Sequence, residues 1–412
     1  MVHLFLFDID GVLVDAQAYQ KALRDTVSHF SRRMGLGDHP PADVEIRAFE
    51  ANGLNSEWDS GAACVAALLL ERLRRESSLP LPSHWPEALS ALSAHPFPLP
   101  HPDYANMAQK VGQRLQEGRT SPAQAAHAVL WDEAQAITSS ARSNLAPLLD
   151  TLLGHVHDFY RAPVTRHFQH LVIGSRAVTQ TYDVSPDFES PAYLRHYDRP
   201  LLTADTRARL DGAARVALYT TRPSLPPADE ESETGEATTG YSPEAEMAQA
   251  LVGLDAWPLI GRGRLRWLAR QTGEELERLL KPFPFQALAA IGAAWSGQET
   301  AALRAALTLQ REGQLCSPLS DMGPVTVHVF EDSPGGLEAV ERGVEALRGM
   351  GATVAWRAYG IARDGSSKAA TLAARGASIH SSVNEAVLEA ITTDSVCTAS
   401  DTDYTDFPSQ SV

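Results

Sequence analysis

Short apolar runs that stop at polar residues recur along the chain, and each has the length of a buried strand. They occupy positions 1–7, 214–219, 325–330 and 352–356. Continuous apolar runs of about four to eight residues are typical of strands buried on both faces, as in a parallel sheet. Ligands of open α/β sheets bind outside the carboxyl ends of the strands, so polar groups that follow such a run are placed where chemistry occurs.

Helical spacing of apolar residues fills most of the sequence between these runs. It is clear at 62–73, 123–146, 265–280 and 337–347. Strands that alternate with helices predict an α/β fold, with a Rossmann-like parallel sheet and right-handed crossovers. Residues 16–212 then form a large helical insertion after the first strand, interrupted by a proline-bearing surface loop within 79–102.

The chain of 412 residues exceeds one ordinary compact core, so we expect a discontinuous core and an inserted domain. The residues from 226 to 242 are acidic and poor in apolar side chains, which predicts a mobile loop, and a polar end predicts a disordered tail. The expected divisions are a core at 1–15 and 213–390, a helical cap at 16–212, the acidic loop at 226–242 and the tail at 391–412.

Charge and cysteine content narrow the class of protein. Lys and Arg number 35 against 51 Asp and Glu, a net charge of −16, which argues against a nucleic-acid partner or an anionic membrane surface. Cys64, Cys316 and Cys397 show no ligand or disulfide spacing, which favours the reducing cytoplasm. The apolar run at 62–70 is far shorter than the ~20 residues of a membrane span, and no targeting segment is recognised.

Two carboxylates two residues apart, Asp8 and Asp10, follow the first predicted strand and are followed at once by Gly11. Carboxylates that lie together repel each other and need a cation or a proton between them. A hard divalent ion such as Mg²⁺ is the simplest answer.

Four polar signals follow one another along the chain: Asp8-x-Asp10-Gly11, Thr220, Lys281-Pro282 and Glu331-Asp332. In this order they resemble the four motifs of the haloacid dehalogenase-like hydrolase superfamily. The first motif, Phe7-Asp-Ile-Asp-Gly-Val-Leu-Val-Asp15, is the most specific, and Phe330-Glu-Asp-Ser-Pro-Gly-Gly-Leu-Glu-Ala339 also matches. The insertion stands where subfamily I carries its helical C1 cap but is much larger. Pieces of it, at 53–59 and 194–202, look like phosphoglycolate-phosphatase-like proteins.

The resemblance implies a role for each signal, and the residue types suit phosphoryl transfer. Asp8 is the expected nucleophile, Asp10 the acid and base, and Thr220 and Lys281 the groups that bind phosphoryl oxygens. Thr221 and Arg222 are further candidates for substrate binding. The expected Mg²⁺ ligands are Asp8, the backbone carbonyl of Asp10, Asp332 and, directly or through water, Glu331.

The leading interpretation is a Mg²⁺-dependent phosphatase that hydrolyses a small phosphorylated metabolite through an aspartyl-phosphate while the cap closes over the site. A phosphomutase of the same superfamily shares all four motifs, and a catalytically weak binding or regulatory protein is the alternative from another class. Structural roles compete as well: Arg222 suits a surface salt bridge, and Glu331-Asp332 suits a helix cap. A group of histidines suits a metal site, cap packing or contact with substrate: His155, His157, His167 and His170.

Overall fold

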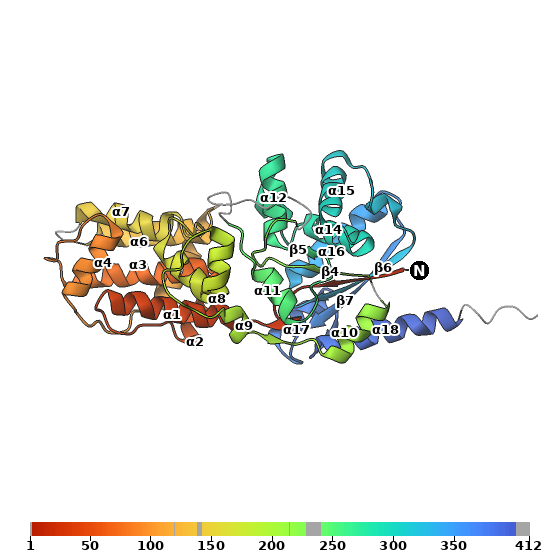
Figure 1. The fold of residues 1–412 in the computed structure, drawn as a ribbon, viewed down its shortest axis with the longest axis horizontal. Coiled ribbons are helices and arrows are strands. Elements are labelled where there is room, and N and C mark those ends of the chain that lie inside the picture. The colour runs from red at the N-terminus through yellow and green to blue at the C-terminus, as the bar shows by residue number, and fades with distance from the viewer. Residues whose placement is uncertain (1, 119, 138–141, 214, 228–239, 401–412) are drawn as a thin grey trace, which may run out of the picture. The chain divides into compact units, whose positions relative to one another are not determined.

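The computed structural model describes residues 2–118, 120–137, 142–213, 215–227 and 240–400. Contacts divide the chain into two compact units, which Figure 1 shows as ribbons. Unit 1 comprises residues 1–16, 198–232 and 241–412, and unit 2 comprises residues 17–197 and 233–240.

A six-stranded sheet forms the centre of unit 1, in the order β5-β4-β1-β6-β7-β8, and all of its pairings are parallel. The strands are β1 (Val2–Phe7), β4 (Arg215–Tyr219), β5 (Leu259–Ile260), β6 (Val325–Glu331), β7 (Val354–Ile361) and β8 (Ser378–His380). The predicted α/β class with a parallel Rossmann-like core is therefore confirmed. Strand β7 begins two residues later than the apolar run predicted at 352–356 and extends to Ile361.

Strand β1 is central, and its alternate residues enter two separate apolar clusters. Leu4 and Leu6 belong to one cluster, whereas Phe5 and Phe7 belong to the other. Successive strand side chains point to opposite faces, so helices must cover the sheet on both sides. The register pairs Phe7 with both Leu218 of β4 and Phe330 of β6, so the residues that follow these strands meet at one edge.

Helices cover both faces of this sheet. The mostly apolar α14 packs against β1, β4 and β5, while α18 contacts β6, β7 and β8. The helices of unit 1 are α10 (Ala204–Ala213), α11 (Glu244–Leu251), α12 (Arg262–Thr272), α13 (Leu276–Leu279), α14 (Phe285–Ser296), α15 (Glu299–Glu312), α16 (Pro334–Gly349), α17 (Ser367–Ala374) and α18 (Val383–Ser400).

A short antiparallel pair lies where the chain leaves unit 1 and where it returns. Strand β2 (Val14–Asp15) pairs with β3 (Arg199–Pro200), and the Leu201 amide donates to the Leu13 carbonyl at 2.8 Å. The helical insertion thus ends at Tyr197, about fifteen residues before the predicted boundary of 212, because β3 and α10 pack with the sheet unit.

Unit 2 is helical, and its long central helix α3 is buried along most of its length against α1, α6 and α8. Its helices are α1 (Ala18–Arg33), α2 (Asp43–Ala51), α3 (Glu57–Arg75), α4 (Trp85–Ala94), α5 (Tyr104–Glu117), α6 (Pro122–Gln135), α7 (Leu145–Leu149), α8 (Pro163–Tyr182) and α9 (Tyr193–His196). Helix α4 interrupts the loop predicted at 79–102. Its Pro86 lies in the first turn, where a missing N–H costs no hydrogen bond.

The structure differs from two further predictions and describes little of the residues concerned in a third. The helix expected at 265–280 is two helices, because Gly273 adopts a left-handed φ of 74° that ends α12. Helix α18 continues to Ser400, well into the range expected to be a disordered tail. Most of the acidic stretch, 228–239, and the last residues, 401–412, lie outside the described residues.

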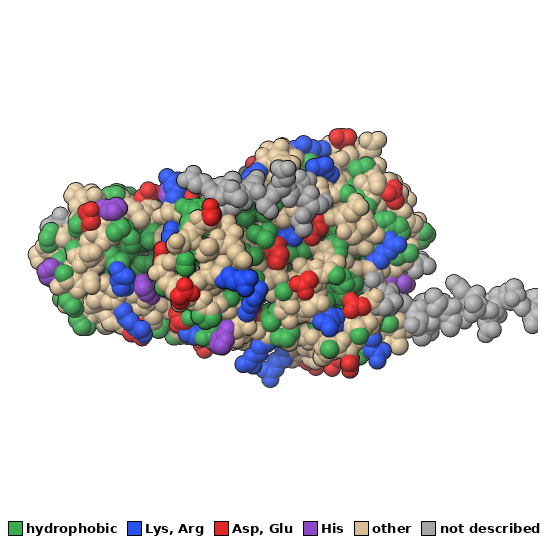
Figure 2. Space-filling view, viewed as in Figure 1, with side chains coloured by type: hydrophobic (Ala, Val, Ile, Leu, Met, Phe, Trp, Pro, Cys, Tyr) green, Lys and Arg blue, Asp and Glu red, His purple; other side chains and the backbone are tan. Residues whose placement is uncertain are grey.

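The charges on the surface are mixed rather than segregated. On the face shown in Figure 2, acidic and basic side chains are interspersed with tan and green surface. Among the residues that the structure describes, no helix combines the length and apolar character needed to cross a membrane.

Candidate functional site

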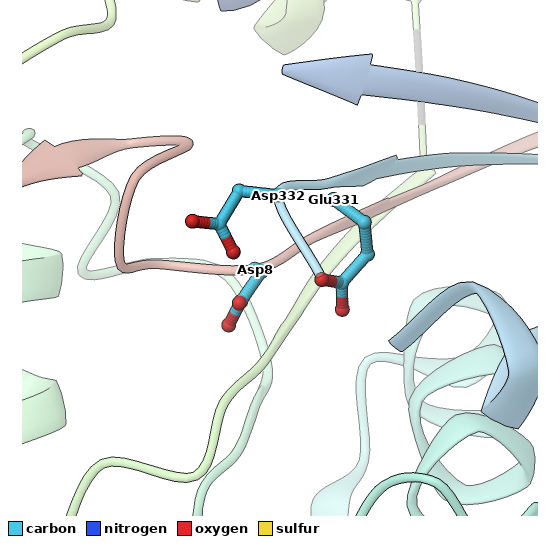
Figure 3. A group of neighbouring side chains, drawn as sticks. All are labelled: Asp8, Glu331 and Asp332. Atoms are coloured by element: carbon cyan, nitrogen blue, oxygen red, sulfur yellow. The ribbon is translucent and has the colours of Figure 1, made fainter. Parts of the chain in front are cut away.

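Three carboxylates from adjacent strands converge at the carboxyl edge of the sheet. Asp8 follows β1, Glu331 is the last residue of β6 and Asp332 follows it (Figure 3). One oxygen of each lies within 4.8 Å of an oxygen of the others, and no other acidic, histidine or cysteine group of this kind occurs among the described residues. Asp8 is 8% exposed and Glu331 is fully buried. We call these three residues the carboxylate cluster.

Lys281 supplies a buried positive charge to this cluster. Its Nζ donates to Glu331 Oε1 at 2.5 Å and lies 3.2 Å from Asp8 Oδ1. The ammonium also lies over the ring of Tyr219, 3.9 Å from its centroid, an arrangement in which the ring face attracts a cation. Burial alone would lower the pKa of Lys281, but Asp8 and Glu331 outweigh burial and raise it, so the side chain stays charged.

The nearby lysines do not fully offset the burial of Asp8 and Asp332. Burial raises the pKa of Asp8 well above its ordinary value, and Lys281 opposes that rise. Burial likewise raises the pKa of Asp332, opposed by Lys368 of α17, whose Nζ contacts Asp332 Oδ2. Buried carboxylates with raised pKa values gain from an added cation, which favours their charged form.

The donors of the cluster fit a hard divalent ion. Carboxylate oxygens are the ligands that Mg²⁺ and Ca²⁺ take, and the cluster offers three of them. Gly11 makes the approach of Asp332 possible: its φ is +71°, and a Cβ there would lie 2.3 Å from Asp332 Oδ2. The sequence predicted the backbone carbonyl of Asp10 as a further ligand. The side chain of Asp10 is not part of the cluster.

Thr220 follows β4 at the same edge and is almost completely buried. Its hydroxyl oxygen accepts from the Arg222 amide at 3.2 Å, and its carbonyl accepts from Gln286 Nε2 at 2.9 Å. Thr221, the neighbouring candidate, is exposed. The end of β4 therefore buries Thr220 and exposes Thr221.

Gln286 is a site residue that the sequence analysis missed. The side chain is fully buried at the start of α14; its Nε2 donates to the carbonyls of Thr220 and Ile260, and its Oε1 accepts from the Lys281 amide at 3.4 Å. It thereby ties the Lys281 loop to the end of β4. A single amide within the apolar sequence of α14 was the available signal, because buried polar groups need partners.

Glu331 is fixed by the start of α16. Ser333 caps this helix by accepting from the Gly336 amide, and its hydroxyl donates to Glu331 Oε2 at 2.9 Å. A Cβ on Gly336 would lie 1.8 Å from Glu331 Oε1, so a larger residue would displace that carboxylate. The alternative that Glu331 and Asp332 cap the helix is wrong, since Ser333 is the N-cap residue.

Arg222 joins Asp10 to Asp198 beside the cluster. Its Nε donates to both Asp10 oxygens at 2.9 Å, and its Nη2 donates to Asp10 Oδ1 at 2.6 Å and to Asp198 Oδ2 at 3.0 Å. The surface salt bridge weighed for Arg222 is replaced by a buried one, because the arginine side chain is 2% exposed. Asp198 was not identified from the sequence.

The candidate histidines of unit 2 have partners other than a shared metal site among the described residues. His157 pairs with Asp59 at 3.1 Å, while His167 stacks on His29 with centroids 3.9 Å apart. Burial lowers the pKa of His167 to about 3, so it is neutral at ordinary pH. Among the described residues no metal group includes any of the candidates His155, His157, His167 and His170.

Among known proteins, the chain is similar only to solved structures. No family model matches the chain, and no curated protein matches it. An X-ray structure of a Northeast Structural Genomics Consortium target is 16% identical, with a TM-score of 0.60 over 96% of this chain and 99% of that one. That similarity establishes a shared fold. Phosphatase Tt82 from Thermococcus thioreducens is 15% identical over 88% of this chain and 93% of its own, but a TM-score of 0.41 is too low to relate its activity to this chain.

Proposed function

We propose that the protein is a Mg²⁺-dependent phosphatase of the haloacid dehalogenase-like hydrolase superfamily that acts on a small phosphorylated metabolite. The observation that carries the proposal is the carboxylate cluster with Lys281 buried against it. Asp8 and Lys281 lie 273 positions apart in sequence (281 − 8), yet their charged atoms are 3.2 Å apart. Convergence of nucleophile, cation and acidic ligands at one sheet edge is what this chemistry requires.

The proposed reaction has two displacements at phosphorus. An oxygen of Asp8 bonds to phosphorus as the ester P–O bond breaks, and the departing oxygen takes a proton from Asp10. A water then gives a proton to Asp10 while its oxygen bonds to phosphorus and the bond to Asp8 breaks. Inorganic phosphate leaves, and both aspartates return to their starting states.

The remaining residues bind charge in this scheme. Lys281 stabilises the charge on the phosphoryl oxygens, and Thr220 donates a hydrogen bond to them. Asp8, Asp332, the Asp10 carbonyl and Glu331 would hold the Mg²⁺, which when bound adds positive charge at the transferred group. The raised pKa of Asp8 explains why the nucleophile would need both Lys281 and a metal to remain a carboxylate.

Phosphate release from a panel of phosphorylated metabolites and 4-nitrophenyl phosphate, with and without Mg²⁺, tests the proposal. We expect Mg²⁺-dependent release from the wild-type protein and at least a ~10³-fold loss in Asp8→Asn, because a nucleophile is removed. Asp364→Asn, at an exposed aspartate, is the matched control and should retain full activity.

The same experiment separates the two competing interpretations. Isomerised sugar phosphate without free phosphate would favour a phosphomutase. A folded wild-type protein that turns over nothing on the panel would favour a binding or regulatory protein, and so would unchanged activity in Asp8→Asn.

A further inference from the structure

Tyr219, the last residue of β4, presents the face of its ring to the Lys281 ammonium. The Lys281 Nζ lies 3.9 Å from the ring centroid, and Tyr219 is fully buried. An aromatic face attracts a cation, and the attraction is strongest where water is excluded. Only 8% of the Lys281 side chain is exposed, so this contact between cation and ring is largely desolvated.

The two charged partners of Lys281 lie at unequal distances. Its Nζ is 2.5 Å from Glu331 Oε1 and 3.2 Å from Asp8 Oδ1. A lysine ammonium is a compact charge on a flexible stem, so two carboxylates alone allow it to move toward the nearer one. The ring adds a third, neutral contact, and β4 fixes the ring, because Tyr219 pairs in parallel register with Ile260 of β5.

We propose that Tyr219 is a positioning residue whose ring face holds the Lys281 ammonium beside Asp8, where it stabilises the transferred phosphoryl group. The inference rests on the proposed function and deepens it, because Tyr219 acts through Lys281 and is not itself a catalytic or metal-binding residue. Without the ring, the ammonium moves toward Glu331 and stabilises the phosphoryl oxygens less well. That loss should lower kcat more than it raises KM, because the stabilisation is stronger in the transition state than in the ground state.

Two variants separate the ring from the rest of the side chain. Tyr219→Phe keeps the ring, and Tyr219→Leu removes it. We measure the hydrolysis of 4-nitrophenyl phosphate at saturating Mg²⁺. In Tyr219→Leu we expect a ~10- to 30-fold loss in kcat with KM changed less than about threefold, whereas Tyr219→Phe should retain kcat within about threefold of wild type.

Replacement of Tyr219 by fluorinated phenylalanines gives the sharper test. Each added fluorine withdraws electron density from the ring face and weakens its attraction for a cation, while the shape of the ring hardly changes. We expect kcat to fall stepwise from phenylalanine through its monofluoro, difluoro and trifluoro forms. A ring that serves only to fill space would give the same kcat throughout. This series also tests the proposal where Tyr219→Leu does not fold.

Two controls make the outcome specific. Tyr241→Leu removes another buried tyrosine of unit 1, whose ring lies under a different cation, with its centroid 4.9 Å from Arg270 Cζ. Its kcat should stay within about threefold of wild type, since Lys281 keeps its own ring. In a Lys281→Met background, Tyr219→Leu should add less than a ~threefold loss, because residues that act as a unit are not additive.

In an active wild-type background, a kcat that does not vary with the number of fluorines would overturn the positioning role and leave the phosphatase proposal standing. Equal losses in Tyr219→Phe and Tyr219→Leu would also overturn it, because the hydroxyl would then be the group that matters. So would an equal loss in Tyr241→Leu, which would mark the effect as general damage to the core. A folded wild-type protein that releases no phosphate would refute the proposed function and this inference together.

Discussion

Strands β1 and β6 bury titratable side chains in two regions, and they deal with burial in opposite ways. In the first, His3 and His328 lie in contact on the sheet, with Nδ1 and Nε2 3.1 Å apart. In the second, at the carboxyl edge of the same strands, Asp8 and the Glu331-Asp332 pair converge. Burial disfavours the charged form of any titratable group, so a buried group must either become neutral or gain a partner of opposite charge.

In the histidine region, His328 is neutral. Burial, with a smaller effect from His3, lowers the pKa of His328 to about 3. The neutral ring then behaves as an aromatic residue: it stacks on Phe5 with centroids 4.7 Å apart and lies 5.9 Å from the Tyr359 ring. This region needs no counter-ion and packs as part of the core.

In the carboxylate cluster, the acidic side chains are paired with lysines of opposite charge. Lys281 and Lys368 contact the three carboxylates, and the burial of Asp8 and Asp332 still raises the pKa of both. Buried carboxylates with perturbed pKa values are typical of functional sites. Both regions are buried, and they differ in whether the titratable groups are neutral or paired with opposite charge.

Removal of Lys281 should break this contrast most severely. Lys281→Met leaves three carboxylates within 4.8 Å of one another without their most buried cation, so we expect a ~10²–10³-fold loss in kcat at saturating Mg²⁺. Thermal unfolding without Mg²⁺ should also occur at a lower temperature, because an unpaired buried charge is destabilising. Phosphate release and a thermal melt check the two effects.

Lys281→Arg is the companion variant, since it keeps the charge but not the compact ammonium over Tyr219. It should restore the melting temperature more fully than the activity. Activity within tenfold of wild type in Lys281→Met would contradict the assignment of this lysine to the site.

A second prediction sharpens the histidine side of the contrast through pH. The unfolded chain takes up a proton at His328 near the ordinary pKa of 6.5, whereas the folded protein does so only near pH 3. The free energy of unfolding therefore decreases as the pH falls from 6.5 toward 3, and this residue contributes up to about 1.4 kcal/mol per pH unit. The contribution of the neutral ring is fully present above pH 6.5.

Urea unfolding of wild type and His328→Phe across that range measures the slope. The variant should have the flatter pH dependence, because one proton no longer distinguishes the two states. His84→Phe, at a histidine that is 69% exposed, is the control and should leave the slope unchanged. Equal slopes for wild type and His328→Phe would contradict a neutral buried ring.

The smallest expected effect concerns Lys368, whose ammonium contacts the same Asp332 oxygen that lies nearest to Gly11. Because this lysine is 49% exposed, its pairing is weak, and we expect Lys368→Met to bind Mg²⁺ only roughly two- to fivefold more tightly. Calorimetric titration with Mg²⁺ measures this without substrate. High salt should reduce the difference through screening.

Lys21→Met provides the matched control for that titration, since Lys21 also pairs with an aspartate, Asp25, at similar exposure. It should leave Mg²⁺ binding unchanged. Weaker binding in Lys368→Met would show that the lysine supports the metal site instead of competing for it.

The sequence predicted the parts of the molecule that follow from local pattern. The apolar runs gave β1, β4 and β6, and the polar residues that follow them do meet at one edge of the sheet. Gln286 and Asp198 escaped prediction because their contacts join residues far apart in the chain, and neither lies in a recognisable motif. Arg222 was identified, but its partners were not, since only the folded sheet brings Asp10 beside it.

The central place of β1 has a consequence for how the protein is made. Strand β1 is synthesised before both of its partners, β4 and β6, which begin at Arg215 and Val325. At the ~5–20 residues per second of synthesis, its apolar run waits tens of seconds for those partners. During that interval β1 lacks its partner strands, whereas the helices of unit 2 can form from neighbouring sequence. The proposed activity would therefore report that synthesis has passed β6 and that β1 lies between both of its partner strands.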